Sequence, residues 1–286
     1  MIDLIANTYG GYLAALRDPQ WRMRMTETLE RLLNRMIADG LIEQEGDKLR
    51  LTMLGRACGE SPLRLESAMR LVELIRQIDP AECSLENLLV LVESLPERDE
   101  DYTPQTSKGE PKWQGEAGTR FGFNVARSLR HRATSDKEFY ARCKRALVVS
   151  DWIAGESTSD IESRFSSNLF LRVGHGDIRG YADGARFLLE SALRIAAIVL
   201  ERAEDPDQVD VLLKRLDLGL PADALGLTEI DVLLTRGELL VLWRAGHVTL
   251  EGVKGLSEEV LRSLIGRRGK MVFDALHPAP AEAAAS

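Results

Sequence analysis

Residues Gly176 to Arg202 have the sequence GDIRGYADGARFLLESALRIAAIVLER, and the interpretation of the whole chain starts from this stretch. Apolar residues recur in it at intervals of three and four, which is the spacing of one buried helix face. The members of this face are Leu188, Leu189, Ala192, Ile195, Ala196 and Val199. The pattern therefore predicts one long amphipathic helix.

Phe187 lies off this face, because most of its helical neighbours are polar: Asp183, Gly184, Glu190, Ser191 and Arg194. The sequence thus predicts an aromatic ring at a polar edge of the helix, between two arginines. Two interpretations stay open at this point. The ring packs against a neighbouring domain, or it stacks on an unpaired base while the arginines hold the nucleic-acid backbone.

The composition is that of a soluble globular protein with room for about two domains. The chain has 286 residues, a formal net charge of −8 and a pI of about 5.3. An acidic total argues against indiscriminate coating of DNA, because the DNA backbone is itself negatively charged. A local cluster of basic residues is still compatible with a nucleic-acid site.

No metal or cofactor site is expected from the sequence. Cys58, Cys83 and Cys143 are far apart and the four histidines have no metal-ligand spacing, so reduced thiols of a cytoplasmic protein are predicted. Residues 1–21 lack the basic start of a signal peptide. The longest apolar run, Ile195 to Leu200, is too short to span a bilayer, so no membrane partner is expected.

A winged helix is predicted for residues 1–59. Residues 21–40 have a helical apolar stripe that Gly40 ends, and two short strands, 41–42 and 49–51, flank a turn at Gly46 and Asp47. The charges on the helix alternate in sign and form no basic face. A structural brace is therefore favoured over a reader of DNA sequence, and a transcription regulator would require a footprint on a defined duplex.

The next segments are predicted as a helical connector at 60–100 and a linker at 101–119. The connector contains a helix from Glu60 to Ile78, with Pro62 in its first turn, and a second helix from Leu85 to Leu95 that Ser84 caps. Residues 96–118 are acidic and then rich in Pro and Gly, which is typical of a surface loop.

The charge reverses between Arg120 and Arg145, where eight basic residues minus two acidic ones leave +6. Such a segment is a candidate for contact with phosphates. The alternative is a solvated face that pairs with acidic surface of this protein or of a partner.

A ratchet-like helical bundle is predicted for residues 120–205, and a helix-hairpin-helix domain is predicted for residues 206–276. The bundle contains helices at 138–153 and 157–165 as well as the long helix. The later domain contains a helix at 209–218 and short helices at 224–235 and 239–245, and such hairpins hold DNA phosphates with backbone N–H groups. The tail, 277–286, is of low complexity and is predicted to be disordered.

The order of these parts resembles the C-terminal half of a group of superfamily-2 DNA helicases, which includes the archaeal fork-repair helicases and the helicase half of DNA polymerase theta. The matching stretches are TYGGYL from Thr8, GLI…LRLTMLGR from Gly40, RCKRALVVSDWIAGESTSDIESRF from Arg142, GDIRGYADGARFLLESALRIA from Gly176 and LLTRGELLVLWRAGHVTLEGV from Leu233. The resemblance implies that Gly176 onward is a so-called ratchet helix, which touches a translocating single strand. By its position after Gly176 and Asp177, Phe187 matches the aromatic that stacks on a base. The resemblance also implies that the winged helix is mainly a brace.

Two features depart from the family pattern. The chain has no GxxxxGK[ST] phosphate loop, since GTRFGFN at 118–124 has neither the lysine nor the spacing, and it has no DExH-type motif. We therefore expect that the chain alone is not an enzyme. The terminal hairpin, placed at Thr235 to Glu238, lacks one of the two usual glycines, and Glu238 would face phosphate unfavourably.

The sequence therefore predicts a mainly α protein: a winged helix, a ratchet-like helical bundle and a helix-hairpin-helix. It would hold single-stranded DNA, or RNA, without a cofactor and would act with a helicase ATPase subunit on another chain. The alternative is a helicase-derived scaffold for protein interactions that has lost DNA binding. The predicted nucleic-acid-binding residues are Arg120, Arg127, Arg130, Arg132, Lys144, Arg145, Arg179, Arg186, Phe187, Arg194 and Arg236.

Overall fold

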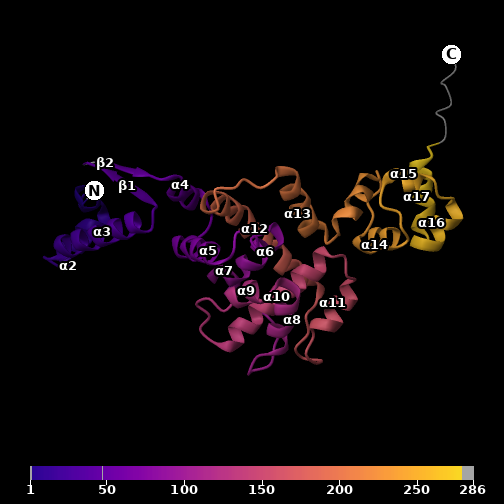
Figure 1. The fold of residues 1–286 in the computed structure, drawn as a ribbon, viewed down its shortest axis with the longest axis horizontal. Helices are drawn as coiled ribbons and strands as arrows, with labels where there is room; N and C mark the ends of the chain where they lie inside the picture. The colour runs from indigo at the N-terminus through magenta and orange to yellow at the C-terminus, as the bar shows by residue number, and fades with distance from the viewer. Residues whose placement is uncertain (1, 47, 279–286) are drawn as a thin grey trace, which may run out of the picture. The chain divides into compact units, whose positions relative to one another are not determined.

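The computed structural model describes residues 2–46 and 48–278 and is mainly helical, with one two-stranded sheet (Figure 1). The predicted fold class is confirmed. The chain forms two compact units that meet in sequence at Leu65. Each unit is described by itself below.

The N-terminal unit has the helix and strand order of a winged helix. Its elements are α1 (Ile2–Ala6), α2 (Tyr9–Arg17), α3 (Trp21–Ala38), β1 (Ile42–Glu45), β2 (Lys48–Leu51) and α4 (Met53–Glu60). The two strands are antiparallel, and Ile42 pairs with Leu51. Asp47, the second residue of the predicted turn, lies outside the described residues.

The tightest packing in this unit is between α4 and the chain just before β1. Thr52 caps α4, because its Oγ1 accepts from Gly55 N at 3.0 Å, and the same hydroxyl donates to Gly40 O at 2.6 Å. A Cβ on Gly55 would lie 1.9 Å from Leu41 O, so only glycine fits there. By contrast, none of the 18 residues of α3 is buried, so its predicted apolar stripe is only partly covered.

The second unit holds the helical bundle and the terminal domain. Its elements are α5 (Leu65–Gln77), α6 (Leu85–Leu91), η1 (Val92–Ser94), α7 (Pro96–Asp99), α8 (Lys112–Phe121), α9 (Phe123–Ser128), α10 (Asp136–Ile153), α11 (Thr158–Phe165), α12 (His175–Val199), α13 (Pro206–Leu218), η2 (Ala222–Glu229), α14 (Arg236–Arg244), α15 (Leu250–Lys254), α16 (Glu258–Ile265) and α17 (Arg268–Leu276). Pro62 lies between α4 and α5 rather than inside a first helical turn, since the helix expected from Glu60 begins only at Leu65.

Helix α10 occupies the centre of the bundle. It contacts α8, α11, α12 and α13, and 14 of its 18 residues are buried. A helix that is covered on all sides belongs to the interior of a domain. The long helix predicted from Gly176, α12, packs against α10 and contacts α6 as well.

Residues 101–119, predicted as a linker, are instead part of the bundle. Gln105 and Glu110 are buried, and Gln105 Nε2 donates to Lys137 O at 3.0 Å. Trp113 is 1% exposed and its ring stacks on Phe165 with centroids 4.9 Å apart. The prediction of a surface linker was wrong, because Pro and Gly residues interrupt regular secondary structure but do not require a segment to lie at the surface.

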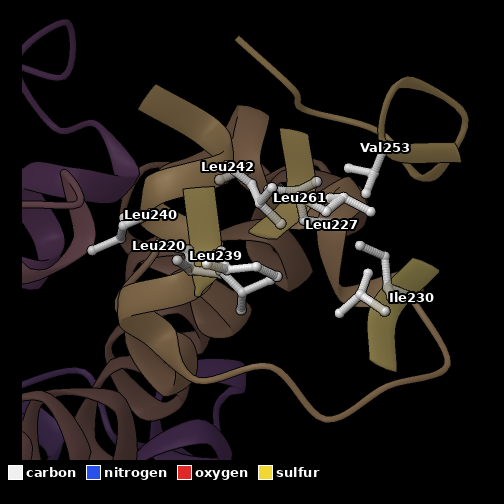
Figure 2. Close-up of a cluster of buried hydrophobic side chains, with 11 residues drawn as sticks. Leu220, Leu227, Ile230, Leu239, Leu240, Leu242, Val253 and Leu261 are labelled. Carbon is white, nitrogen blue, oxygen red and sulfur yellow. The ribbon is translucent and has the colours of Figure 1, made fainter. Parts of the chain in front are cut away.

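The terminal domain has a separate small core, drawn in Figure 2. Its buried members come from η2, α14, α15, α16 and α17 and include Leu227, Leu242 and Leu261. The helix predicted at 224–235 is a shorter 3₁₀ segment that ends at Glu229. Pro206 is the first residue of α13, where a missing N–H costs nothing. The three cysteines are free and buried, and most of the predicted tail, 279–286, lies outside the described residues.

Candidate nucleic-acid interface

Helix α12 presents Phe187 to solvent. The helix begins with a cap in which Gly174 N donates to Asp177 Oδ2 at 2.9 Å. Its buried face includes Leu188, Leu189 and Ala192, as the periodicity predicted. Phe187 stands on the opposite side and is 60% exposed. The ring is therefore free to contact a flat partner while the helix below it is fixed.

The charges around Phe187 are largely paired along α12. Arg186 Nε lies 2.8 Å from Asp217 Oδ1 of α13, and Arg179 lies 3.3 Å from Asp183 on its own helix. Arg194 is exposed, two turns beyond Phe187 on the same side, and has no ion-pair partner within the described part of the chain. Arg194 is therefore the available cation next to the ring.

Lys144 and Arg145, predicted to contact phosphates, are buried. Lys144 is fully covered: its ammonium donates to Pro104 O and lies 3.5 Å from Glu110 Oε2. Burial lowers the pKa of this lysine, although Glu110 acts in the opposite direction. Arg145 is 1% exposed, and its Nε donates to Glu93 Oε2 at 2.8 Å. Neither side chain reaches the surface, so both are removed from the predicted site.

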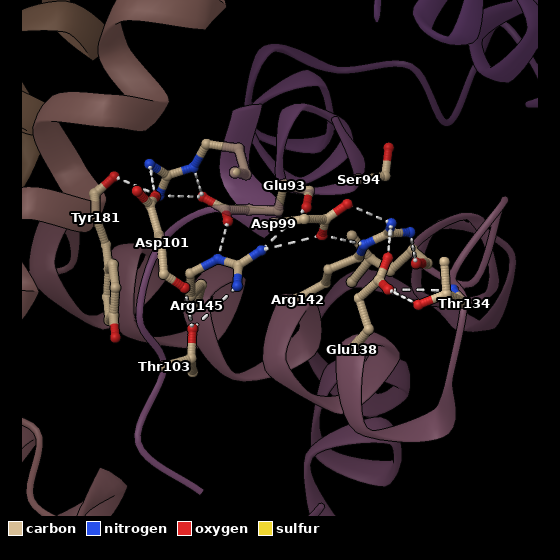
Figure 3. Close-up of polar contacts among 12 residues, drawn as sticks. Glu93, Ser94, Asp99, Asp101, Thr103, Thr134, Glu138, Arg142, Arg145 and Tyr181 are labelled. Atoms are coloured by element: carbon tan, nitrogen blue, oxygen red, sulfur yellow. Dashed lines mark hydrogen bonds and ion pairs between the residues drawn. The ribbon is translucent and has the colours of Figure 1, made fainter. Parts of the chain in front are cut away.

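A continuous network of buried charges holds Arg145 in the interior (Figure 3). Glu93, itself fully buried, accepts from Arg98 on one oxygen and from Arg145 on the other. Burial alone would raise the pKa of Glu93, but the two guanidiniums overcome it and hold the pKa below its usual value. Arg142 is held in the same way, since its Nε and Nη2 donate to the two oxygens of Asp99 at 2.8 and 2.7 Å.

Four predicted arginines do stand at the surface, on or beside α8 and α9. Arg120 donates to Ser150 Oγ at 3.2 Å, and Arg127 is exposed. Arg130 pairs with Asp136 at 2.7 Å, and Arg132 donates to both oxygens of Glu73 at 2.8 Å. Exposed ion pairs of this kind are weak, because water screens them, so these arginines can exchange their partners for phosphate.

Arg179 and Arg236, both predicted to bind nucleic acid, instead lie against the buried ring of Trp152. Trp152 is 2% exposed; the guanidinium of Arg236 lies 4.0 Å from its centroid and that of Arg179 lies 5.7 Å away. Arg236 also donates to three backbone carbonyls, those of Gly219, Trp152 and Glu156. Burial, with a smaller effect of Arg244, lowers the pKa of Arg236 to about 10. These arginines join the bundle to α13 and α14.

The hairpin expected at Thr235 to Glu238 is a helix cap. Glu238 Oε2 accepts from Thr235 N at 2.7 Å, and Thr235 Oγ1 accepts from Glu238 N in return. Glu238 also lies 3.1 Å from Arg268, so its carboxylate faces a guanidinium and not open solvent.

A hairpin with two glycines is present 30 residues later, between α16 and α17. It has the sequence Gly266-Arg267-Arg268-Gly269, and Gly266 has φ +66°. A Cβ on Gly269 would lie 2.4 Å from Leu261 C of α16, so the second glycine lets the two helices touch. Arg267 and Lys270 are exposed. The G-R-R-G spacing was the sequence signal for these two cations, and it was missed.

The described residues hold no cluster of three or more His, Cys, Asp or Glu that could bind a metal ion. Across the same residues, no helix is both long and apolar enough to cross a membrane.

Comparison with known proteins finds a family model that matches the bundle and relatives that match more of the chain. The family described as archaeal helicase, domain 4, matches residues 88–219, from α6 to the end of α13. An ATP-dependent DNA helicase Hel308 of Pyrobaculum calidifontis is 23% identical over 279 residues, which are 98% of this chain and 36% of that protein. The Hel308 helicase of Pyrococcus abyssi is 27% identical over 138 residues, 48% of this chain and 18% of that protein. The chain thus spans about a third or less of these relatives, and the similarities support a helicase-derived C-terminal region.

Proposed function

We propose that this chain is a non-catalytic region that guides single-stranded DNA for a superfamily-2 helicase, whose ATPase motor lies on another chain. The observation that carries the proposal is the exposed Phe187 on α12, within the residues that match archaeal helicase domain 4. An aromatic side chain at 60% exposure gains little from folding, so its contribution is expected on binding.

In this proposal Phe187 stacks on a base, and Arg194 contacts a phosphate beside it. Stacking on an aromatic is worth about 1–3 kcal/mol per base and tolerates any sequence, because every base has a π-face. Below the ring, Arg98 donates to Tyr181 O at 3.0 Å and so ties α12 to the buried charge network. A ring on a helix held in this way is pre-organised for stacking.

The rest of the strand would follow the exposed arginines Arg120, Arg127, Arg130 and Arg132, and the two cations of the α16–α17 hairpin. Arg179 and Arg236 act in this proposal by positioning α12, α13 and α14, since their guanidiniums donate to backbone carbonyls. The ion pair of Arg186 with Asp217 is as exposed as that of Arg132 with Glu73, so Arg186 can exchange its partner for phosphate in the same way.

The test is fluorescence anisotropy with labelled single-stranded DNA, the matching RNA and duplex DNA over a series of salt concentrations. Phe187→Ala is expected to weaken single-strand binding at least about fivefold, the lower end of the stacking range. Tyr102→Ala is a matched control, because Tyr102 is 68% exposed but lies among the acidic residues Asp99 and Asp101. Equal losses in the two variants would contradict the proposal.

The role of the motor is tested separately. Adding the chain to an isolated superfamily-2 ATPase core is expected to restore ATP hydrolysis stimulated by single-stranded DNA. A purified pair that shows no stimulation would count against a two-chain helicase.

One observation favours a second function, a helicase-derived protein scaffold. Four large apolar side chains of the N-terminal unit, Tyr9, Tyr12, Leu16 and Met23, are between 55% and 76% exposed. Tyr9, Tyr12 and Leu16 follow one another at helical spacing along α2, and exposed apolar patches are typical of protein-binding sites. If the chain bound no nucleic acid at low salt, the scaffold would become the leading proposal.

A further inference from the structure

A hollow of about 370 Å³ lies between α8, α9 and the start of α10. Its volume falls within the range of about 300–1,000 Å³ that is usual for pockets of small ligands. Its lining combines two aromatic rings, two guanidiniums and two side-chain amides: Phe123, Phe139, Arg127, Arg130, Gln114 and Asn124. Phe123, the two guanidiniums and the two amides are groups that can stack on a base, hold a phosphate and bond to a base edge, whereas Phe139 is 2% exposed and lies under Arg130.

Phe123 is the exposed aromatic ring of this lining. It is the first residue of α9 and is 79% exposed. A Cβ on Gly118 would lie 2.9 Å from the Phe123 ring, so the ring rests directly on the backbone of α8. The ring is thus supported from below and open above, as Phe187 is on α12.

The two guanidiniums differ in how they are held. Arg130 lies 4.5 Å from the centroid of the Phe139 ring and pairs with Asp136 at 2.7 Å. Arg127 is exposed, and its hydrogen bond to Asn124 Oδ1 is long, at 3.5 Å.

Asn124 in turn donates to Glu82 at 3.1 Å, so its oxygen is oriented toward Arg127. The carboxylates beside the hollow, Glu82 and Asp136, are each engaged by one of these neighbours. Arg127 makes no ion pair in the described part of the chain, so its guanidinium is free to hold an anion, although the neutral Asn124 amide leaves the Glu82 carboxylate charged.

We propose that this hollow binds an unpaired nucleotide of single-stranded DNA, with the base on Phe123 and the phosphate on Arg127 and Arg130. Charge complementarity selects this occupant, because an apolar protein segment would leave the Arg127 guanidinium desolvated without a partner. The inference rests on the proposed function, since it places a second contact on the strand that Phe187 holds.

The experiment is photocrosslinking of the full chain to oligothymidylate that carries 5-iododeoxyuridine, which couples to stacked aromatic side chains on irradiation. Trypsin separates the two sites by sequence: Phe123 falls in the peptide FGFNVAR at 121–127, and Phe187 in FLLESALR at 187–194. The expected result is label in both peptides, with Phe123→Ala removing it from the first only.

Each other outcome has one meaning. Label in 187–194 alone, or label in 121–127 that survives Phe123→Ala, overturns the second site and leaves the proposed function standing. Label in neither peptide overturns both. Label in 121–127 alone supports the hollow and overturns the role of Phe187.

Affinity gives an independent readout. Phe123→Ala and Arg127→Gln are each expected to weaken single-strand binding about fivefold or more, with the thermal midpoint unchanged because both side chains are exposed. Tyr102→Ala, the control of similar exposure, is expected to bind as the unchanged protein does. Equal affinity of Phe123→Ala and Tyr102→Ala would overturn the inference.

Discussion

Replacing Arg145 with Met tests whether the buried charges hold the bundle together or bind nucleic acid. Arg145 Nε and Glu93 Oε2 are 2.8 Å apart, and both side chains are 1% exposed. Arg145 Nη1 also donates to Thr103 Oγ1 at 3.0 Å. The substitution leaves Glu93 in the interior with Arg98 as its remaining partner. Removing one member of a buried ion pair costs about 3–5 kcal/mol, because the other charge stays desolvated.

This cost is large enough to measure by thermal unfolding. For a domain of about 150–250 residues, 1 kcal/mol lowers the midpoint by about 2–4 °C, so Arg145→Met is expected to melt about 6–20 °C lower. Arg127→Met is the matched control, since this arginine is exposed and its loss is expected to change stability by no more than about 0.5 kcal/mol. Well below the midpoint, Arg145→Met should bind single-stranded DNA normally. A variant that melts within about 2 °C of the unchanged protein and has lost DNA affinity would refute the reasoning.

Three further predictions concern stability and can be measured by urea unfolding. A Cβ on Gly184 would lie 1.9 Å from Arg98 Nη1, so Gly184→Ala is expected to lower the free energy of unfolding by about 1–3 kcal/mol. A Cβ on Gly180, on the same helix, would meet nothing within 4 Å, so the control Gly180→Ala should raise the free energy of unfolding by about 0.5–1 kcal/mol. The pKa of Glu93 is held low in the folded protein, so the ionised carboxylate contributes fully to the free energy of unfolding above the unfolded pKa of about 4.3. This contribution is lost as the pH falls through the lower folded pKa. The difference in free energy of unfolding between the unchanged protein and Glu93→Gln should therefore shrink below about pH 4 and be constant above about pH 5. Gly269→Ala should cost about 1–3 kcal/mol by pushing α17 away from α16, and no loss would mean that the helices do not need close contact.

The features that sequence predicted well are those that short-range periodicity determines. The buried face of α12 and the exposure of Phe187 both follow from residues within two turns of one another, so no distant partner was needed to place them. The cap at Asp177 was also predictable, because its partner, Gly174, is three residues away. Where a side chain has its partners close in sequence, the pattern alone determines its place.

Lys144 and Arg145 could not be placed in this way, because their partners are far away in the chain. Glu93 precedes Arg145 by 52 residues and Glu110 precedes Lys144 by 34. A helix with charges on several sides predicts a solvated surface unless buried carboxylates are known to meet it. The hairpin at Gly266 and Gly269 was missed for a different reason: Thr235 to Glu238 also carries an arginine beside a glycine at the start of a helix, and so resembles such a hairpin.

The buried cations of the basic segment and the residues predicted as a linker were both wrongly placed at the surface, because they bond to each other in the interior. Pro104 O and Glu110 hold Lys144, and Thr103 holds Arg145, so burying one segment required burying the other. Five of the eight basic residues pair with acids of this same protein, as the alternative proposed, but only Arg130 and Arg132 do so at a solvated face, whereas Arg142, Lys144 and Arg145 do so in the interior.

The four exposed arginines of the basic segment, Arg120, Arg127, Arg130 and Arg132, determine how much this segment contributes to the salt dependence of single-strand binding. Each phosphate contact on a single strand contributes about 0.7 to the slope of log affinity against log salt, so the four exposed arginines of this segment give a slope of about 3, where all six residues predicted to bind in it would give about 4. Arg127→Gln should lower the measured slope by about 0.7 and Arg145→Met should leave it unchanged, because only the first side chain reaches solvent. A slope that falls in Arg145→Met would mean that the buried network opens on binding, and the bundle would then have to rearrange around the strand.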